Sequence, residues 1–284
     1  MPMPEEIRGL PAWVSFLSRV DIPVMRQTAR ELARAREDPR ALDARRIARI
    51  VVRDPMMTAK LLRHLTQQRR RGRAGELVQI DQAVMMLGMD AFYAGIRPEP
   101  LVDDVLRGET DALARVLRVV RRAQRASTFA MDWAARLHDL HWEEVRIAAL
   151  LHDLAEMLAW CFAPELMRKV YATMRRDPAA RSRSTQEAIF GFALHDLQTA
   201  LARAWGLPDL LLKLMDDAYA DNERVRNVML AVNLARHSAD GWSDAALPDD
   251  FRAIADLLRS TPEHVIELIG AEASPASAPG NATG

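Results

Sequence analysis

Apolar residues recur every three or four positions through most of the chain, the spacing that places them on one face of an α-helix. The segments 24–37 and 43–55 show this pattern most clearly, with breaks at Pro39 and Pro55. No convincing run of alternating β-branched residues appears, so we expect no sheet and predict an all-α protein. Further helices are predicted over 78–92, 111–137, 143–161, 163–176, 185–204, 208–219, 223–238, 249–259 and 262–270.

Residues that favour helix ends punctuate this pattern. Asp54 is a candidate N-cap, followed by Pro55, which suits the first helical position. Gly88 and Gly206 are candidate C-caps, and Pro208 is placed to open the helix that follows Gly206. The sequence therefore predicts several of its helix boundaries as well as the helices.

Charge is balanced over the whole chain but not along it. The 284 residues include 39 Lys and Arg and 39 Asp and Glu, so no global field favours nucleic acid or membranes. Between Arg26 and Arg73, however, fifteen basic residues face five acidic ones. The tightest basic run, "RRRGR", is a candidate phosphate or nucleic-acid patch, although a solvated loop and helix end is the favoured interpretation. Its arginines are Arg69, Arg70, Arg71 and Arg73.

Several features of the sequence indicate the cellular compartment of the protein. Cys161 is the only cysteine, so no intrachain disulfide can form, which suits a reducing environment. The N-terminus has neither a basic region nor an apolar region of a signal peptide, and no apolar run reaches eighteen residues. We therefore predict a cytoplasmic protein with no membrane partner. The segment 271–284 is rich in Pro, Gly and Ser and is predicted to be disordered.

The stretch "ALLHDLAEML", residues 149–158, places a His and an Asp side by side in an apolar helical run. On a continuous helix over 143–161, His152, Asp153 and Glu156 fall on one narrow polar stripe. Such a stripe either faces a cavity that holds a ligand or metal, or is the solvent-facing strip of an ordinary helix. The adjacent pair alone favours the solvent-facing strip.

A resemblance to a known family shifts this balance. "IAALLHDLAEML" resembles the central helix of the HD superfamily, in which a His-Asp pair ligates a divalent metal. Three other stretches, at 47–65, 78–92 and 189–217, are similar in order and spacing to the HDOD family, the HD-related output domains of bacterial signalling proteins. The resemblance spans about residues 10–240, which is most of the chain.

The resemblance implies an HD-like helical bundle in two packed groups. The first, over 10–97, would form an N-terminal bundle, and the second, over 111–240, would hold the cavity of the former active site. Additional C-terminal helices are expected at 241–270.

Departures from the family pattern affect the metal site. The upstream His of catalytic HD enzymes is missing from residues 121–128, "RRAQRAST". Asp216 and Asp217 stand where two histidines often occur, and Asn233 stands where a metal-binding Asp is expected. Glu156 replaces the Lys that often follows the pair, which reverses a charge where a phosphate would need stabilisation.

These departures weigh against catalysis. His152 and Asp153 supply two ligands, His195 offers a third, and a hydrolytic site needs three or more plus an open position for water. We therefore predict no cofactor and no catalytic residue, with His152 and Asp153 as the weak candidates for metal ligands. The expected function is a non-catalytic regulatory domain that contacts signalling proteins.

Two alternatives stay open. The first is a divalent-metal phosphohydrolase that uses His152, Asp153, His195 and Asp216. The second is nucleic-acid binding through the basic N-terminal region, which the overall charge balance disfavours. A second messenger in the cavity is conceivable, but no sequence feature supports it.

Overall fold

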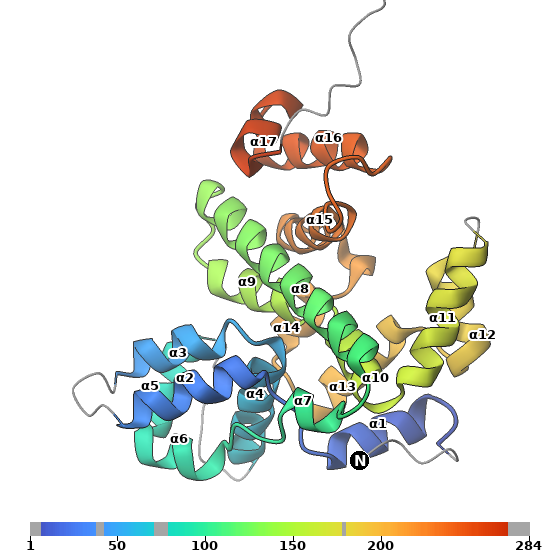
Figure 1. Cartoon of the computed structure of the whole chain (residues 1–284). Coiled ribbons are helices and arrows are strands. Elements are labelled where there is room, and N and C mark those ends of the chain that lie inside the picture. The colour runs from blue at the N-terminus through green and yellow to red at the C-terminus, as the bar shows by residue number, and fades with distance from the viewer. Residues whose placement is uncertain (1–6, 38–42, 71–78, 178–179, 272–284) are drawn as a thin grey trace, which may run out of the picture.

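The structure is a computed structural model that describes residues 7–37, 43–70, 79–177 and 180–271. Within these residues all regular structure is helical, apart from an isolated parallel bridge between Val24 and Leu101 (Figure 1). The prediction of an all-α fold is confirmed. The tail predicted to be disordered lies outside the described residues, except for Ala271.

The first group of helices lies at the left of Figure 1. It consists of α2 (Arg26–Glu37), α3 (Ala44–Val51), α4 (Pro55–Arg70), α5 (Ile80–Leu87) and α6 (Met89–Gly95). A short helix, α7 (Val102–Val105), leads from it to the second group.

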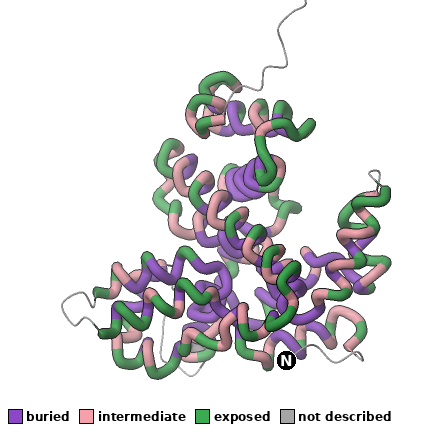
Figure 2. The backbone as a smooth tube through the Cα atoms, in the orientation of Figure 1, coloured by how far each residue is buried: buried purple, intermediate pink, exposed green. Residues whose placement is uncertain are grey.

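The second group is built on the long helix α8 (Thr110–Arg136), which crosses the centre of Figure 1. Three helices pack on it, namely α9 (Trp142–Leu151), α10 (Leu154–Phe162) and α15 (Glu223–His237). The sides that these helices turn toward one another are buried (Figure 2). The remaining helices are α11 (Pro164–Arg176), α12 (Ser182–Phe190), α13 (Leu194–Trp205), α14 (Asp209–Leu214), the 3₁₀ turn η2 (Asp217–Tyr219), and a C-terminal pair, α16 (Leu247–Leu258) and α17 (Pro262–Ile269).

Helix α1 (Leu10–Arg19) departs from the predicted division of the chain. Its main packing partner is α13 of the second group, while Arg63 of α4 donates to the carbonyl of Val20 at the C-terminal end of α1, at 3.1 Å. The ring of Trp13 lies 5.4 Å from that of Phe190 and 5.7 Å from that of Phe192, both edge-on. Because edge-to-face aromatic pairs add to the burial of large side chains, these contacts fix α1 on the second group.

Helix α4 begins as its sequence predicts, at a fully buried carboxylate. Asp54 Oδ1 accepts hydrogen bonds from the backbone N–H groups of Met56 and Met57, at 3.0 and 3.1 Å. Its Oδ2 accepts a third from the N–H of Met25, at 2.8 Å, just before α2. One side chain therefore caps α4 and ties it to α2.

Replacement of this cap should destabilise the fold. Asp54→Ala leaves three N–H groups, two of them buried, without their acceptor, so we expect the free energy of unfolding to fall by about 2 kcal/mol, the upper end of capping losses. Asp54→Asn keeps an acceptor oxygen and should lose less. Denaturant unfolding measures both, and equal losses for the two variants would contradict the capping role.

The prediction of one continuous helix over 143–161 is wrong. The segment 143–161 is interrupted at the His-Asp pair, where α9 ends at Leu151 and α10 begins at Leu154. Asp153 leaves the helical conformation, with φ −101° and ψ 21°. Contacts of its carboxylate with side chains from α8 and α15, described below, outweigh the helix preference of the surrounding Leu and Ala residues.

No single helix among the described residues is long and apolar enough to cross a membrane. By length and composition alone one bent pair passes this test together, Trp142–Phe162 with Pro164–Arg176, at an angle of 114°. In the structure, the residues of α10 are almost entirely buried in the protein core.

Candidate functional site

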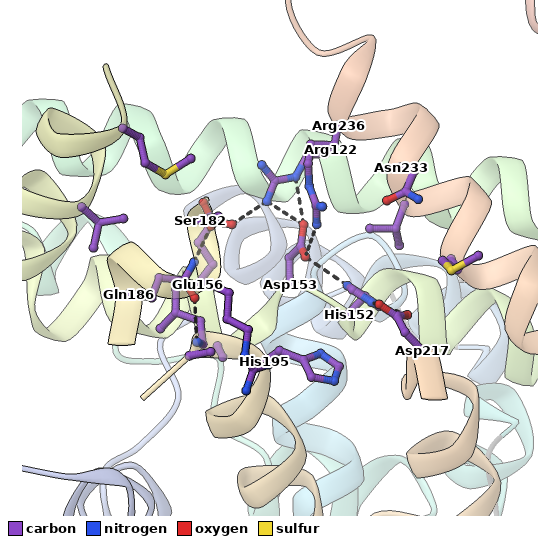
Figure 3. A pocket seen from close by; sticks show the side chains of 18 of the residues that line it. Arg122, His152, Asp153, Glu156, Ser182, Gln186, His195, Asp217, Asn233 and Arg236 are labelled. Carbon is purple, nitrogen blue, oxygen red and sulfur yellow. Dashed lines mark hydrogen bonds and ion pairs between the residues drawn. The ribbon is translucent and has the colours of Figure 1, made fainter. Parts of the chain in front are cut away.

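A cavity of about 920 Å³ opens between α8, α10, α11, α12, α13 and α15. We call it the His-Asp cavity, and Figure 3 shows it from close by. All seven residues predicted for the former active site line it, namely His152, Asp153, Glu156, His195, Asp216, Asp217 and Asn233.

An arginine from α8 is the main cation of the cavity. Arg122 donates to Asp153 Oδ2 through both Nη2 and Nε, at 2.6 and 2.9 Å. Its Nη2 also donates to Glu156 Oε2, at 2.6 Å. The three side chains are only 11–17% exposed, so this salt bridge is largely withdrawn from solvent and its electrostatic attraction is strong.

Asp153 receives two more cationic groups on its other oxygen. His152 Nδ1 donates to Oδ1 at 3.1 Å, and Arg236 Nη2 from α15 lies 3.5 Å from the same atom. Figure 3 shows this carboxylate between the two guanidinium groups and the imidazole ring. Burial opposes ionisation of Asp153, but Arg122, His152 and Arg236 outweigh it and hold its pKa well below the ordinary value.

His152 is the imidazole of this cluster. Burial by itself would lower its pKa, but the neighbouring carboxylates of Asp153 and Asp217 outweigh this effect and raise the pKa to about 9. Its Nε2 lies 3.9 Å from Asp217 Oδ1. The raised pKa favours the protonated ring, and a protonated imidazole has no free lone pair for a metal.

Glu156 is also held on both oxygens. Its Oε1 accepts a hydrogen bond from the hydroxyl of Tyr171 on α11, at 2.9 Å, while Oε2 accepts from Arg122. Burial and the charge of Glu156 raise the pKa of Tyr171, which keeps that hydroxyl protonated as a donor. The guanidinium of Arg115 stacks on the same ring, 4.7 Å from its centroid.

The other predicted site residues share the cavity without converging on one point. The rings of His195 and His152 have centroids 6.3 Å apart. Asp216 caps the turn η2 by accepting from the N–H of Ala218 at 3.0 Å. Over residues 7–37, 43–70, 79–177 and 180–271, no three His, Cys, Asp or Glu side chains are arranged to hold a metal ion.

The divalent ion that the family resemblance implies does not fit these donors as they stand. Asp153 and Glu156 are bound on both oxygens by cations or a hydroxyl, and the raised pKa of His152 favours its protonated form. Metal ligands must instead be deprotonated and have free lone pairs. The positive charge that such an ion would bring is supplied by the guanidinium of Arg122.

Sequence analysis missed the two arginines that organise the cavity. Arg122 lies within the stretch 121–128, where the upstream His of catalytic HD enzymes is missing, and thirty positions before His152. The sequence therefore showed that the metal-ligating His is missing from this stretch. The more informative feature is the positive charge of Arg122, which stands in its place. Arg236 lies one helical turn after Asn233 on α15 and carries no comparable signal.

The structure does not describe the side chains of the basic run Arg69–Arg73. Helix α4 extends to Arg70, and the rest of the run, with the side chains of Arg69 and Arg70, lies outside what the structure describes.

Comparison with known proteins identifies the family and the fold. The profile of the HDOD domain matches residues 22–220, and no curated protein matches the sequence. The structure is similar to the MmoQ response regulator from Methylococcus capsulatus str. Bath, with a TM-score of 0.65 and 17% identity over 89% of this chain and 99% of that one. It is also similar to a virulence factor from Campylobacter jejuni subsp. jejuni, with a TM-score of 0.63 and 18% identity over 94% of each chain. Identities this low establish a shared fold and leave function to be argued from the site.

Proposed function

The chain belongs to the HDOD domain family, and from that premise we propose that it is a non-catalytic signalling domain that works by contacting other signalling proteins. The observation that carries the proposal is Arg122, whose guanidinium bridges Asp153 and Glu156 inside the cavity. The MmoQ protein of the same fold is named a response regulator, which supports a signalling context.

The chemistry of the cavity supports the non-catalytic part of the proposal. Hydrolysis at an HD-type site needs a metal with an open position, where a bound water is activated as the nucleophile. Here the central carboxylate is already compensated by fixed cations, and the acidic Glu156 stands where the family pattern often has a Lys. The cluster instead joins α8, α10 and α15, which suits a structural role.

Metal analysis and hydrolysis assays test this proposal directly. Protein purified without chelators should carry far less than one equivalent of Mn, Fe, Zn or Mg, and its melting temperature should be the same with EDTA or Mn²⁺. Hydrolysis of bis(p-nitrophenyl) phosphate should stay at the buffer rate with each metal. A stoichiometric ion, together with a metal-dependent rate that Asp153→Asn abolishes, would establish the phosphohydrolase alternative.

Complementation in the native host tests the non-catalytic part in the cell. His195 lies outside the Arg122 salt bridge but is the third ligand that the phosphohydrolase alternative needs. A His195→Gln gene should therefore rescue a deletion strain as fully as the wild-type gene. Failure of a stably folded His195→Gln protein to rescue would count against a non-catalytic role.

A further inference from the structure

A second region of the molecule combines hollows with an excess of positive charge. Three adjoining hollows of about 270, 500 and 470 Å³ lie between the α2–α3 pair and helices α8 and α9. The first and second share Val52 and Arg146, and the second and third share Gln27 and Leu117, among others. They therefore form one continuous groove, which we call the arginine groove.

Arginines follow this groove in two helical rows. Arg26, Arg30 and Arg34 are spaced four apart on α2 and all line its third hollow. Arg45 and Arg49 have the same spacing on α3 and line the first hollow. Like charges four apart on a helix disfavour the helix. Two such rows therefore destabilise α2 and α3, and the stability of the fold does not explain their presence.

The opposite wall and the middle of the groove add to this charge. Arg53 follows α3, Arg121 is exposed on α8, and Arg146 lies on α9. In all, eight arginines and four carboxylates line the three hollows. Only two of these arginines have a carboxylate within ion-pair distance among the described residues, Arg26 with Asp103 at 3.0 Å and Arg53 with Glu31 at 3.9 Å. The groove therefore has an unneutralised positive charge.

We propose that the arginine groove binds the sugar-phosphate backbone of a nucleic acid, without reading its sequence. Every cation in its lining is an arginine, whose planar fork can bind two phosphate oxygens at once. One turn of helix separates successive arginines by about 6 Å, so each row presents several guanidinium groups along one line. This inference is independent of the role of the His-Asp cavity.

The middle of the groove favours a nucleic acid over an acidic protein. The side chains of Gln27, Gln124 and Thr128 line it and already donate hydrogen bonds within the protein. Each glutamine keeps a second amide N–H, which is a typical donor to phosphate oxygens. A protein partner would need an apolar centre with large side chains to anchor it. Trp142, 36% exposed in the first hollow, is the one aromatic residue that lines the groove in the described structure, where it could stack on a base.

Fluorescence anisotropy measures the binding of labelled nucleic acids and tests the proposal. The probes are single-stranded DNA and single-stranded RNA of twenty nucleotides and duplex DNA of twenty base pairs. The test variant is Arg30→Gln/Arg34→Gln/Arg49→Gln, and the control is Arg19→Gln/Arg176→Gln/Arg203→Gln. All six arginines are exposed and make no ion pair with a described residue, so both variants lower the charge equally and leave the ion pairs of the fold intact. The preferred probe among the three identifies the kind of nucleic acid.

We expect the wild type and the control to bind alike and the test variant to bind at least about tenfold more weakly at 50 mM salt. The slope of log affinity against log salt should fall by about 0.7–0.9 for each phosphate that the variant no longer neutralises. Absence of binding, or equal weakening in the control, would overturn the proposal. Displacement of the oligonucleotide by polyglutamate as readily as by unlabelled oligonucleotide would do the same, in favour of an acidic protein.

Discussion

Arg122→Met is expected to lower the free energy of unfolding by about 3–5 kcal/mol, the usual result when one partner of a buried ion pair is removed. The methionine fills similar space, but Asp153 and Glu156 then face each other with their main cation gone. Arg236 can replace only part of this charge, because its side chain is 46% exposed and its Nη2 lies 3.5 Å from Asp153 Oδ1. Urea unfolding at neutral pH measures the loss.

Two comparisons show whether this loss comes from the salt bridge. Arg118→Met changes an exposed arginine one turn away on the same helix and should leave stability nearly unchanged. Arg122→Met/Asp153→Asn/Glu156→Gln removes both charges along with their partner and should recover most of the loss, since no carboxylate is left uncompensated. A triple variant as unstable as Arg122→Met would mean that packing, and not charge, dominates at this position.

The fold could be predicted from the sequence because its signals are local. Periodic apolar positions define most helices, and Asp54 with Pro55 marks the start of α4 as expected. The placement of α1 could not be predicted in this way. It depends on contacts of Trp13 with Phe190 and Phe192, 177 and 179 positions away, which no local pattern reveals.

The residues that line the site could be predicted from the sequence, but their arrangement in space could not. Motifs place His152, Asp153 and His195 around one cavity, and all three line it. The break between α9 and α10 could not be predicted, because it depends on partners of Asp153 from α8 and α15. A helical wheel assumes an intact helix, whereas long-range ion pairs decide the conformation at this position.

Arg122→His is expected to restore divalent metal binding at the His-Asp cavity. The change removes the guanidinium from Asp153 and Glu156 and offers an imidazole thirty positions before His152, the place of the upstream His in catalytic HD enzymes. Carboxylates and neutral imidazoles are good ligands for Mn²⁺ and Zn²⁺. Without its internal cation, the cluster should recruit an external one.

The gain should appear as a metal-dependent stability. A ligand present at a hundred times its Kd stabilises the folded state by about 2.7 kcal/mol, so saturating Mn²⁺ should recover much of the stability that Arg122→His loses. EDTA should abolish this recovery, and the wild type should not respond to either. Arg122→His/Asp153→Asn is the matched control, since it keeps the imidazole but loses the central carboxylate, and it should show no metal response. If Mn²⁺ stabilises the wild type as much as Arg122→His, then the guanidinium does not stand in for a metal, and the salt bridge is no barrier to metal binding.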